Sequence, residues 1–441
     1  MIKRLLIANR GEIALRIIRT AKELGIRTIA IYSEADKNSL HVEMADEAIC
    51  IGPPKPSESY LNIPSIMAAA EVSKADAIHP GYGFLSENPT FAQIAKASNI
   101  KFVGPPPEVI EASGDKVIAK KIAKEAGVPL VPGSEDSLTF SEAKEIANSI
   151  GYPIVLKAAA GGGGRGIRIV RDDKELLETM QTAMSEAKNA FGDERIYIEK
   201  YLINPKHIEV QILSDGKNII TLGERECSLQ RRHQKIIEES PSASITDSER
   251  ELLYEYAIRF AKAIDYIGAG TVEFLYTEGQ FYFIEMNARI QVEHPITEMT
   301  TGVDIVAYQL LIADEGELDI NSIKPKGYAI ECRVNAEDPI TFMPSVGTVE
   351  KLRLPGGFGI RVDTHLYQGY SVPQYYDSLL AKMIAYGKDK EEAIRRMKRA
   401  IEETRIEGTS LKSNLDLHKK LLDMTEFKKN EHHVRFLENM I

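Results

Sequence analysis

Short apolar strands alternate with single helices through the first hundred residues, and this alternation restricts the fold more than any other feature of the chain. Strands are predicted at residues 3–9 and 27–32, on either side of a helix that ends at Gly25. The same rhythm continues from residue 60 to residue 104. Because strands joined by single helices form right-handed βαβ units, the pattern predicts a parallel sheet. Ligands of such sheets bind at the carboxyl ends of the strands.

Three consecutive prolines at 105–107 interrupt this rhythm and mark a candidate domain boundary. From there to about residue 200 the pattern predicts a compact α+β segment, which begins with a helix at 115–126. The strands predicted after His207 are mainly antiparallel, and a late β region covers 328–363. The fold class is therefore α/β in the first part of the chain and α+β in the rest.

The overall composition excludes several classes of protein. The 441 residues include 55 Lys and Arg against 65 Asp and Glu, a formal net charge of −10, which argues against a nucleic-acid-binding surface. The longest apolar runs are far shorter than the roughly 20 residues of a membrane helix, and the start of the chain lacks the features of a signal peptide. Three widely spaced cysteines argue against a disulfide scaffold or a zinc site. We therefore expect a cytoplasmic protein of enzyme size.

A glycine-rich run extends from Lys157 to Gly166, between two segments rich in Ile and Val. A flexible linker would have the same composition. The flanking strands favour a hairpin tip instead, where backbone N–H groups can approach phosphate oxygens. The run is not a P-loop, because no Gly-Lys-Ser/Thr follows it. We interpret it as a mobile cover over phosphates, with the Lys157 cation beside it.

Two carboxylates lie on neighbouring predicted strands, Glu273 in 271–276 and Glu285 in 280–287. A three-residue turn would set them opposite each other, about 5.5 Å apart between Cα atoms, whereas a two-residue turn would aim them at opposite faces. Two unpaired carboxylates among apolar neighbours are costly, and a divalent cation such as magnesium would remove that cost. The alternative is a pair of exposed charges on a solvated edge.

Polar residues continue at every second position after Glu285, with apolar residues between them. An extended chain would direct all of these side chains to one face, which we interpret as the floor of an active site rather than a solvated sheet face. They are Asn287, Arg289, Gln291 and Glu293. A basic stretch at 230–235 is either a solvated charge run or part of an anion-receiving cleft.

Five longer motifs stand along the chain: IANRGEIA at 7–14, IHPGYGFLSEN at 78–88, QRRHQK at 230–235, NARIQVEH at 287–294 and ECRVNAEDP at 331–339. Together they resemble the biotin carboxylase family, in that family's order and over essentially the whole chain. The resemblance implies a Rossmann-like, pre-ATP-grasp domain with a parallel sheet at 1–114 and an ATP-grasp domain at 115–325. The latter would carry a mobile glycine-rich lid at about 131–203, and a mainly antiparallel C-terminal domain would occupy 326–441.

The activity that this resemblance implies is ATP-dependent carboxylation of biotin by bicarbonate. Bicarbonate attacks the γ-phosphate of ATP to give carboxyphosphate, which yields CO2 and phosphate; biotin, deprotonated by that phosphate, then attacks CO2. The implied cofactors are ATP and Mg²⁺ or Mn²⁺, with biotin as a carrier-bound substrate. One rival is another ATP-grasp ligase of the carbamoyl-phosphate or purine-pathway type, which would lack Arg333 and the pocket at 291–293. The other is a non-catalytic nucleotide-binding or scaffolding subunit.

Matching the motifs residue by residue implies the members of the site. The ATP-binding residues would be Lys116, Lys157, Gly163, Gly164, His207, Gln230 and His233, with Glu199, Lys200 and Leu202 at the adenine hinge. The metal ligands would be Glu273, Glu285 and Asn287, of which the two glutamates also count as ATP-binding. The bicarbonate and biotin pocket would contain Tyr82, Lys235, Arg289, Gln291, Val292 and Arg333. The catalytic residues would be Lys235, Arg289, Glu293 as the general base, and Arg333, which steadies the biotin enolate.

The chain contains no Met-Lys-Met biotin-attachment motif, so we expect the biotin on a separate carrier protein, with a separate carboxyltransferase subunit that determines the final acceptor. The family is commonly homodimeric, and the matching interface positions are Arg19, Glu23, Phe358 and Arg361. No nucleic-acid or membrane partner is expected. Ala160 replaces one glycine of the family's run, so either lid closure would be stiffer or the affinity for ATP would be altered.

Overall fold

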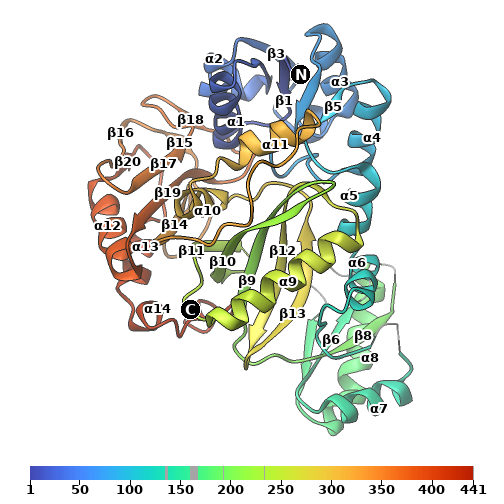
Figure 1. Ribbon diagram of the computed structural model, residues 1–441. Coiled ribbons are helices and arrows are strands. Elements are labelled where there is room, and N and C mark those ends of the chain that lie inside the picture. The colour runs from blue at the N-terminus through green and yellow to red at the C-terminus, as the bar shows by residue number, and fades with distance from the viewer. Residues whose placement is uncertain (135–137, 159–166, 192, 233, 441) are drawn as a thin grey trace.

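The computed structural model describes residues 1–134, 138–158, 167–191, 193–232 and 234–440. Its N-terminal part is a five-stranded parallel sheet in the order β3-β2-β1-β4-β5, which confirms the predicted βαβ pattern (Figure 1). The strands are β1 (Arg4–Ile7), β2 (Arg27–Ser33), β3 (Glu47–Gly52), β4 (Ala77–His79) and β5 (Lys101–Phe102). The helices are α1 (Gly11–Glu23), α2 (Leu40–Met44), α3 (Ile63–Val72) and α4 (Pro89–Ala97).

A smaller α+β unit follows, connected through α5 (Pro107–Gly114) and α6 (Lys116–Glu125). It consists of a three-stranded antiparallel sheet, β7-β6-β8, with two helices and a hydrophobic core of its own (Figure 1). Its elements are α7 (Phe140–Ile150), β6 (Ile154–Ala158), β7 (Ile167–Val170), α8 (Asp173–Phe191) and β8 (Ile196–Lys200). We call this unit, residues 131–203, the lid. The glycine run at 159–166 lies outside the described residues, so the hairpin tip stays a prediction.

The centre of the molecule is an eight-stranded antiparallel sheet in the order β13-β12-β9-β10-β11-β14-β19-β17. Its strands are β9 (Lys206–Asp215), β10 (Ile219–Arg231), β11 (Gln234–Ser240), β12 (Ile267–Thr277), β13 (Gln280–Asn287), β14 (Tyr328–Asn335), β17 (Ile360–Thr364) and β19 (Leu379–Gly387). Pairing between β11 and β14 joins the central part of the chain to the C-terminal part in one continuous sheet.

Helices pack against this sheet. They are α9 (Asp247–Ala263), α10 (His294–Thr301), α11 (Ile305–Ala313) and α12 (Lys390–Glu403). The Thr246 hydroxyl caps α9, and Glu249 returns the bond in a capping box, which fixes where that helix begins. No helix in the described ranges has the length and apolar character needed to span a membrane.

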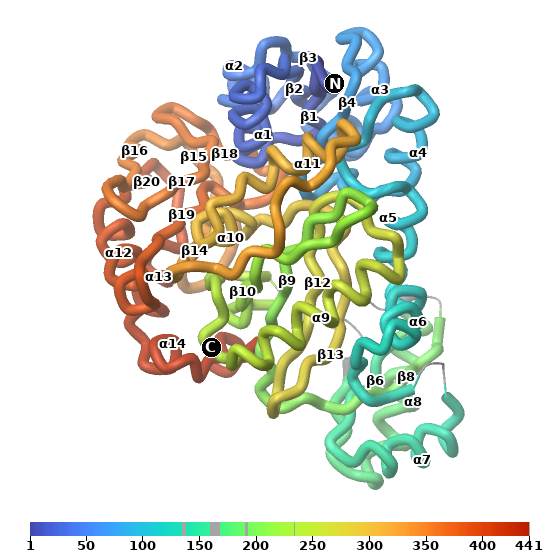
Figure 2. Tube along the Cα trace, in the orientation of Figure 1, coloured from blue at the N-terminus to red at the C-terminus, as the bar shows by residue number. Residues whose placement is uncertain are grey.

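The rest of the C-terminal part contains short elements. They are β15 (Gly347–Thr348), β16 (Lys351–Arg353), β18 (Ser371–Val372), β20 (Arg405–Glu407), α13 (Leu415–Asp423) and α14 (Thr425–Lys428), while two 3-10 turns, η1 (Glu34–Asp36) and η2 (Pro56–Glu58), belong to the N-terminal part. After α14 the chain returns to the central sheet (Figure 2). There the Val434 amide donates to the Pro205 carbonyl over 3.1 Å, so the C-terminal segment lies against the start of β9.

Candidate functional site

A pocket of about 1220 Å³ lies where the N-terminal part, the lid, the central sheet and the C-terminal segment meet. It brings together every described residue that the sequence predicted for the site except Glu293, which lies buried beneath it. The lining members are Tyr82, Lys116, Lys157, Glu199, Lys200, Leu202, His207, Gln230, Lys235, Glu273, Glu285, Asn287, Arg289, Gln291, Val292 and Arg333. The predicted ligands Gly163, Gly164 and His233, and Ala160, lie outside the described residues.

The hairpin that carries the two carboxylates combines both turn geometries considered from the sequence. β12 and β13 are joined by a two-residue turn, Glu278–Gly279, in which both residues have positive φ. That turn alone would put Glu273 and Glu285 on opposite faces. A bulge between Glu273 and Phe274 shifts the register by one residue, so that Glu273 stands directly opposite Glu285 after all.

Glu273 is buried and is held by four side chains. Its Oε1 accepts hydrogen bonds from Lys235 Nζ over 3.1 Å, Asn287 Nδ2 over 2.8 Å and Gln291 Nε2 over 2.9 Å. Its Oε2 lies 3.0 Å from His207 Nε2. Burial opposes ionisation, but the Lys235 cation, together with the contact to His207, outweighs it and holds the pKa of Glu273 below its usual range. The carboxylate is therefore ionised.

Glu285 is more open than its neighbour: 35% of its side chain is exposed, and its Oε2 lies 3.3 Å from Lys116 Nζ. Asn287 follows at the end of β13. The two carboxylates and the amide oxygen of Asn287 are all hard oxygen donors, and they face a pocket lined by cations that would contact a polyphosphate. The donor set thus fits a magnesium ion.

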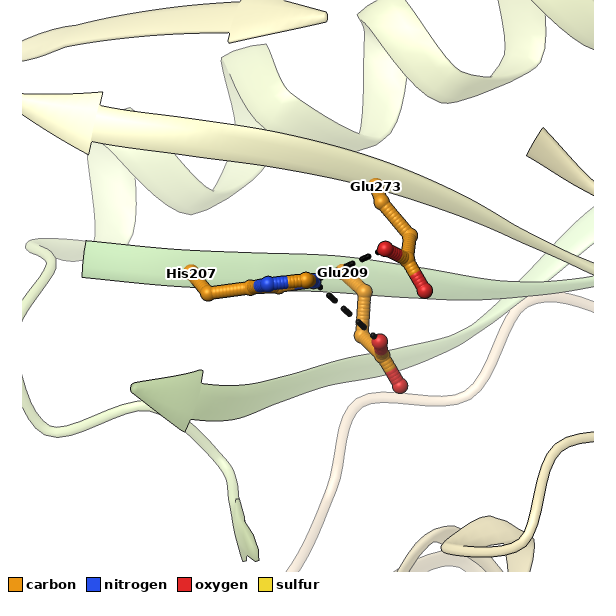
Figure 3. A group of neighbouring side chains, drawn as sticks. All are labelled: His207, Glu209 and Glu273. Atoms are coloured by element: carbon orange, nitrogen blue, oxygen red, sulfur yellow. Dashed lines mark ion pairs between the residues drawn. The ribbon is translucent and has the colours of Figure 1, made fainter. Parts of the chain in front are cut away.

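Glu209 is a buried member of the site that the sequence analysis missed. On β9 it stands two residues after His207 and in register with Glu273 of β12, and His207 Nε2 is 3.7 Å from Glu209 Oε2 (Figure 3). Its carboxylate also accepts from Arg225 Nε and Lys235 Nζ, each over 2.6 Å. Burial raises the pKa of Glu209 in spite of both cations. The alternation of His207 and Glu209 along β9 was the signal that could have revealed it.

Lys235 joins these carboxylates to a third one, Glu293. Lys235 Nζ lies 2.7 Å from Glu293 Oε1, and Arg333 Nη2 lies 2.8 Å from Glu293 Oε2. Burial disfavours the charge of Glu293, yet Lys235 and Arg333 hold its pKa well below the usual range. Arg333 is fixed from its other side by Glu238 Oε1, 2.5 Å from its Nε. The result is an ionised, geometrically fixed carboxylate between two cations.

The predicted continuous strand from Glu285 to Glu293 is wrong, because β13 ends at Asn287 and Glu293 is the N-cap residue of α10. The bent chain still gathers the polar side chains. Arg289 donates through Nη2 to Asn287 Oδ1 over 2.8 Å and through Nη1 to Gln291 Oε1 over 3.1 Å. Its Nε donates to Glu87 Oε2 over 2.8 Å, which brings in a segment of the N-terminal part.

The lid side of the pocket contains the predicted adenine hinge. Glu199 accepts from Lys157 and, over 2.5 Å, from Lys120, a cation that the sequence analysis did not single out. Lys200 Nζ donates to the Gly151 carbonyl over 2.8 Å. The Leu202 carbonyl accepts a 2.5 Å hydrogen bond from Nη2 of a C-terminal arginine. That residue, Arg435, also lies over the Tyr201 ring and lines the pocket together with Val434 and Glu438, so the end of the chain forms one wall of the site.

The predicted dimer positions fall into two groups. Arg19, Glu23 and Phe358 are exposed. Arg361 points inward instead, and its guanidinium lies 2.7 Å from Glu298 Oε2.

Comparison with family models gives three consecutive matches along the chain. Residues 1–110 match "Biotin carboxylase, N-terminal domain", residues 115–321 match "Carbamoyl-phosphate synthase L chain, ATP binding domain", and residues 331–439 match "Biotin carboxylase C-terminal domain".

Individual proteins match over the full length. A biotin carboxylase of Pseudomonas aeruginosa is 53% identical over 446 residues, which cover 100% of this chain and 99% of the relative. The 2-oxoglutarate carboxylase small subunit of Hydrogenobacter thermophilus is 50% identical over 444 residues, with 99% of this chain and 93% of the relative covered. A crystal structure of the biotin carboxylase domain dimer of the 2-oxoglutarate carboxylase from the same organism, in complex with MgADP, ADP and bicarbonate, superposes with a TM-score of 0.90 at 49% identity, covering 100% and 98% of the two chains.

Proposed function

The chain belongs to the biotin carboxylase family, and from this premise we propose that it uses ATP and bicarbonate to carboxylate biotin, releasing ADP and phosphate. The observation that carries the proposal is the ionised Glu293 fixed between Lys235 and Arg333, directly beneath a pocket that also holds the facing pair Glu273 and Glu285. This arrangement combines a base, an anion pocket and a polyphosphate site. The proposed domains are 1–114, 115–325 and 326–441, in line with the ranges that the family models match.

The nucleotide side of the pocket supplies charge and position. Lys116, Lys157 and His207 would contact the phosphates, and the hinge at 199–202 would hold the adenine. Phosphoryl transfer depends mainly on positioning and on neutralising charge that develops on the phosphoryl oxygens. A magnesium ion held by Glu273, Glu285 and Asn287 would add to that neutralisation when bound.

The bicarbonate side lies on the floor of the pocket. Lys235, Arg289 and Gln291 present donors to an anion, and Val292 lines the same region. Bicarbonate is a weak nucleophile, so its proton must leave as it attacks. We assign that proton to the Glu293 carboxylate, which is ionised and held in place by its two cations.

Arg333 and Tyr82 lie on the biotin side. The Arg333 guanidinium, locked in place by Glu238 and Glu293, would stabilise the negative oxygen of the deprotonated ureido ring. Tyr82 lines the same pocket from the N-terminal part.

The deciding experiment measures ATP cleavage by the purified protein with bicarbonate and free biotin. We expect cleavage to require bicarbonate and to be stimulated by biotin. Cleavage indifferent to biotin would favour another ATP-grasp ligase of the carbamoyl-phosphate or purine-pathway type. Intact ATP binding without turnover, even with biotinylated carrier supplied, would favour a non-catalytic nucleotide-binding subunit.

We further propose that the chain works with a separate biotin carrier protein and a carboxyltransferase subunit. The full-length match to a relative that is named a small subunit supports this arrangement. Proteins that co-purify with the tagged chain from cytoplasmic extract would test both the partners and the proposed cytoplasmic location. A homodimer through Arg19, Glu23, Phe358 and Arg361 is proposed from the dimer seen for a related domain, and light scattering would test it.

A further inference from the structure

In the segment 291–293, the backbone carbonyls of Gln291 and Val292 both accept hydrogen bonds from buried side chains. The Gln291 carbonyl accepts from His294 Nδ1 over 2.7 Å, and the Val292 carbonyl accepts from Lys382 Nζ over 3.0 Å. A trans peptide directs its N–H opposite to its C=O. The N–H groups of Val292 and Glu293 therefore point away from His294 and Lys382. In the part of the chain that the structure describes, neither N–H has a protein acceptor.

Lys382 is fully buried, although a lysine is almost never found so. Its place in the sheet explains where its side chain goes. On β19 it stands in register with Arg333 of β14 on one side and with Asp363 of β17 on the other. Neighbours in register project from the same face of a sheet. Lys382 thus projects from the same face of the sheet as Arg333, whose side chain lines the pocket.

The partners of Lys382 come from three separate parts of the chain. Besides the Val292 carbonyl, its Nζ lies 3.1 Å from Glu12 Oε2 on α1 and 3.9 Å from Asp363 Oδ2. The other oxygen of Glu12 accepts the Tyr82 hydroxyl, and Tyr82 lines the pocket. The Lys382 ammonium therefore contacts the 291–293 segment directly. It is also linked, through the Glu12 carboxylate, to Tyr82 on the biotin side of the pocket.

His294 acts on the same segment from the other peptide. Its Nδ1 must carry a proton to donate to the Gln291 carbonyl, since a carbonyl only accepts. Burial, with Lys382 and two arginines close by, lowers the pKa of His294 well below its ordinary value, so the ring is neutral with the proton on Nδ1. Both peptides of the segment are thus fixed by buried donors.

We propose that Lys382 is a positioning residue for bicarbonate: by holding the Val292 carbonyl it fixes the 291–293 backbone with its free N–H groups presented to the anion. The inference rests on the proposed function, in which Val292 and its neighbours form the bicarbonate pocket. A buried ammonium carries three N–H donors that all need acceptors, and Lys382 directs one of them to the Val292 carbonyl. That contact ties the ammonium to the 291–293 backbone, and the separate KM values for bicarbonate and ATP distinguish a positioning role from a purely structural one.

The test is Lys382→Met, which keeps most of the side-chain volume and removes the ammonium. Biotin-stimulated ATP cleavage is measured with bicarbonate and ATP varied separately. We expect the KM for bicarbonate to rise about tenfold, the scale of one misplaced hydrogen-bond donor, with the KM for ATP within about twofold of the parent. A bicarbonate KM that stays at the parental value, or that rises by the same factor as the KM for ATP, would overturn the proposal.

The matched control is Lys390→Met, which removes another largely buried ammonium, 2.7 Å from Glu239 Oε1 and outside the pocket. It should lower stability and leave the bicarbonate KM unchanged; a rise equal to that of Lys382→Met would assign the effect to general destabilisation and overturn the proposal.

A second variant decides the matter if Lys382→Met does not fold. Glu12→Gln keeps the shape of the side chain and its bond to Tyr82 but removes the charge that holds the ammonium. We expect a several-fold rise in the bicarbonate KM with little change in the KM for ATP, and an unchanged bicarbonate KM overturns the proposal. A parent protein that cleaves ATP without needing bicarbonate overturns the proposed function itself. If the parent requires bicarbonate and the KM for bicarbonate is unchanged in Lys382→Met and Glu12→Gln, only the proposed role of Lys382 is overturned.

Discussion

The floor of the pocket and its lid side hold charge in different ways. On the floor, Glu273, Glu293 and Lys235 are at most 11% exposed and pair mainly with one another. On the opposite side Lys157 is 30% exposed and Lys116 is 64% exposed. Buried pairs are hardly screened by salt, whereas exposed charges are. The floor therefore has a fixed geometry suited to the chemical steps, and the lid side offers partly exposed cations, each paired with one carboxylate, that can meet a polyphosphate.

The same contrast determines what a substitution costs. Removing one partner of a buried pair leaves the other charge uncompensated, at about 3–5 kcal/mol, whereas exposed pairs contribute about 0–1 kcal/mol. Variants of the floor should thus affect turnover and folding together, and for that reason the predictions below use near-isosteric changes or include a binding measurement. Variants of the lid side should change nucleotide affinity with little change in stability.

The largest effect is expected from Glu285→Gln. Glu285 lies opposite Glu273 on the β12–β13 hairpin, which forms part of the floor. Its side chain is 35% exposed, which is closer to the exposure of the lysines on the lid side than to that of Glu273. As a metal ligand it should be essential, so we expect turnover to fall to background because the magnesium site is lost. ATP cleavage and Mn²⁺ binding are the measurements. The matched control is Glu278→Gln, at an exposed glutamate in the turn of the same hairpin, which should retain full activity. Parental Mn²⁺ affinity in Glu285→Gln would remove Glu285 from the metal site.

Arg333→Ala should come next and should separate the two sides of the pocket. The guanidinium lies between Glu238 and Glu293 on the floor, and in the described part of the chain neither carboxylate forms an ion pair with the nucleotide-side lysines Lys116 and Lys157. We expect biotin carboxylation to fall by about 10²–10³-fold, the loss typical of one donor to a developing oxyanion. Nucleotide binding, measured by calorimetry, should stay within about twofold of the parent. Equal losses of nucleotide affinity in Arg333→Ala and Glu285→Gln would contradict the division between floor and lid side.

Local patterns in the sequence predicted the lid side and the hairpin well, because these depend on neighbours in the chain. The helix predicted at 115–126 corresponds to α6, Lys116–Glu125, within one residue at each end. The facing of Glu273 and Glu285 was predicted only conditionally, since turn length was visible in principle but the bulge after Glu273 was not. A bulge depends on packing between strands, which no local pattern encodes.

The parts of the floor that the sequence did not predict depend on pairing between strands that are far apart in the chain. Lys382 stands in a strand that is otherwise apolar, and nothing nearby in the sequence shows that Arg333 and Asp363 flank it. Helix α9 was missed for a different reason: its capping box at Thr246 and Glu249 was present in the sequence but was not used. The neighbours of Lys382 could not be predicted locally, because tertiary packing determines which strands pair. The start of α9 could have been predicted, because the capping box is a local sequence pattern.

Lys157→Ala tests the lid side by itself. Lys157 pairs with Glu199 and lines the pocket at the predicted phosphate position. Loss of one charged hydrogen bond should raise the KM for ATP by about tenfold with a smaller change in kcat. Because Lys157 is partly exposed, added salt should also raise the parental KM for ATP and should affect the variant less. An unchanged KM for ATP with a lower kcat would show that Lys157 acts in the chemical step rather than in nucleotide binding.

The smallest effect concerns stability beneath the floor. His418 of α13 is fully buried, and its Nε2 donates to the Arg333 carbonyl over 2.7 Å. Burial lowers the pKa of His418 from 6.5 to about 4, so between those values the unfolded chain binds a proton that the folded chain does not. The free energy of unfolding should therefore fall as the pH is lowered from 7 to 5. In His418→Gln, which keeps a donor and cannot titrate, this fall should be smaller by about 1–2 kcal/mol. Urea unfolding at several pH values measures it, and parallel pH dependences in parent and variant would show that His418 takes up its proton as readily in the folded protein as in the unfolded chain.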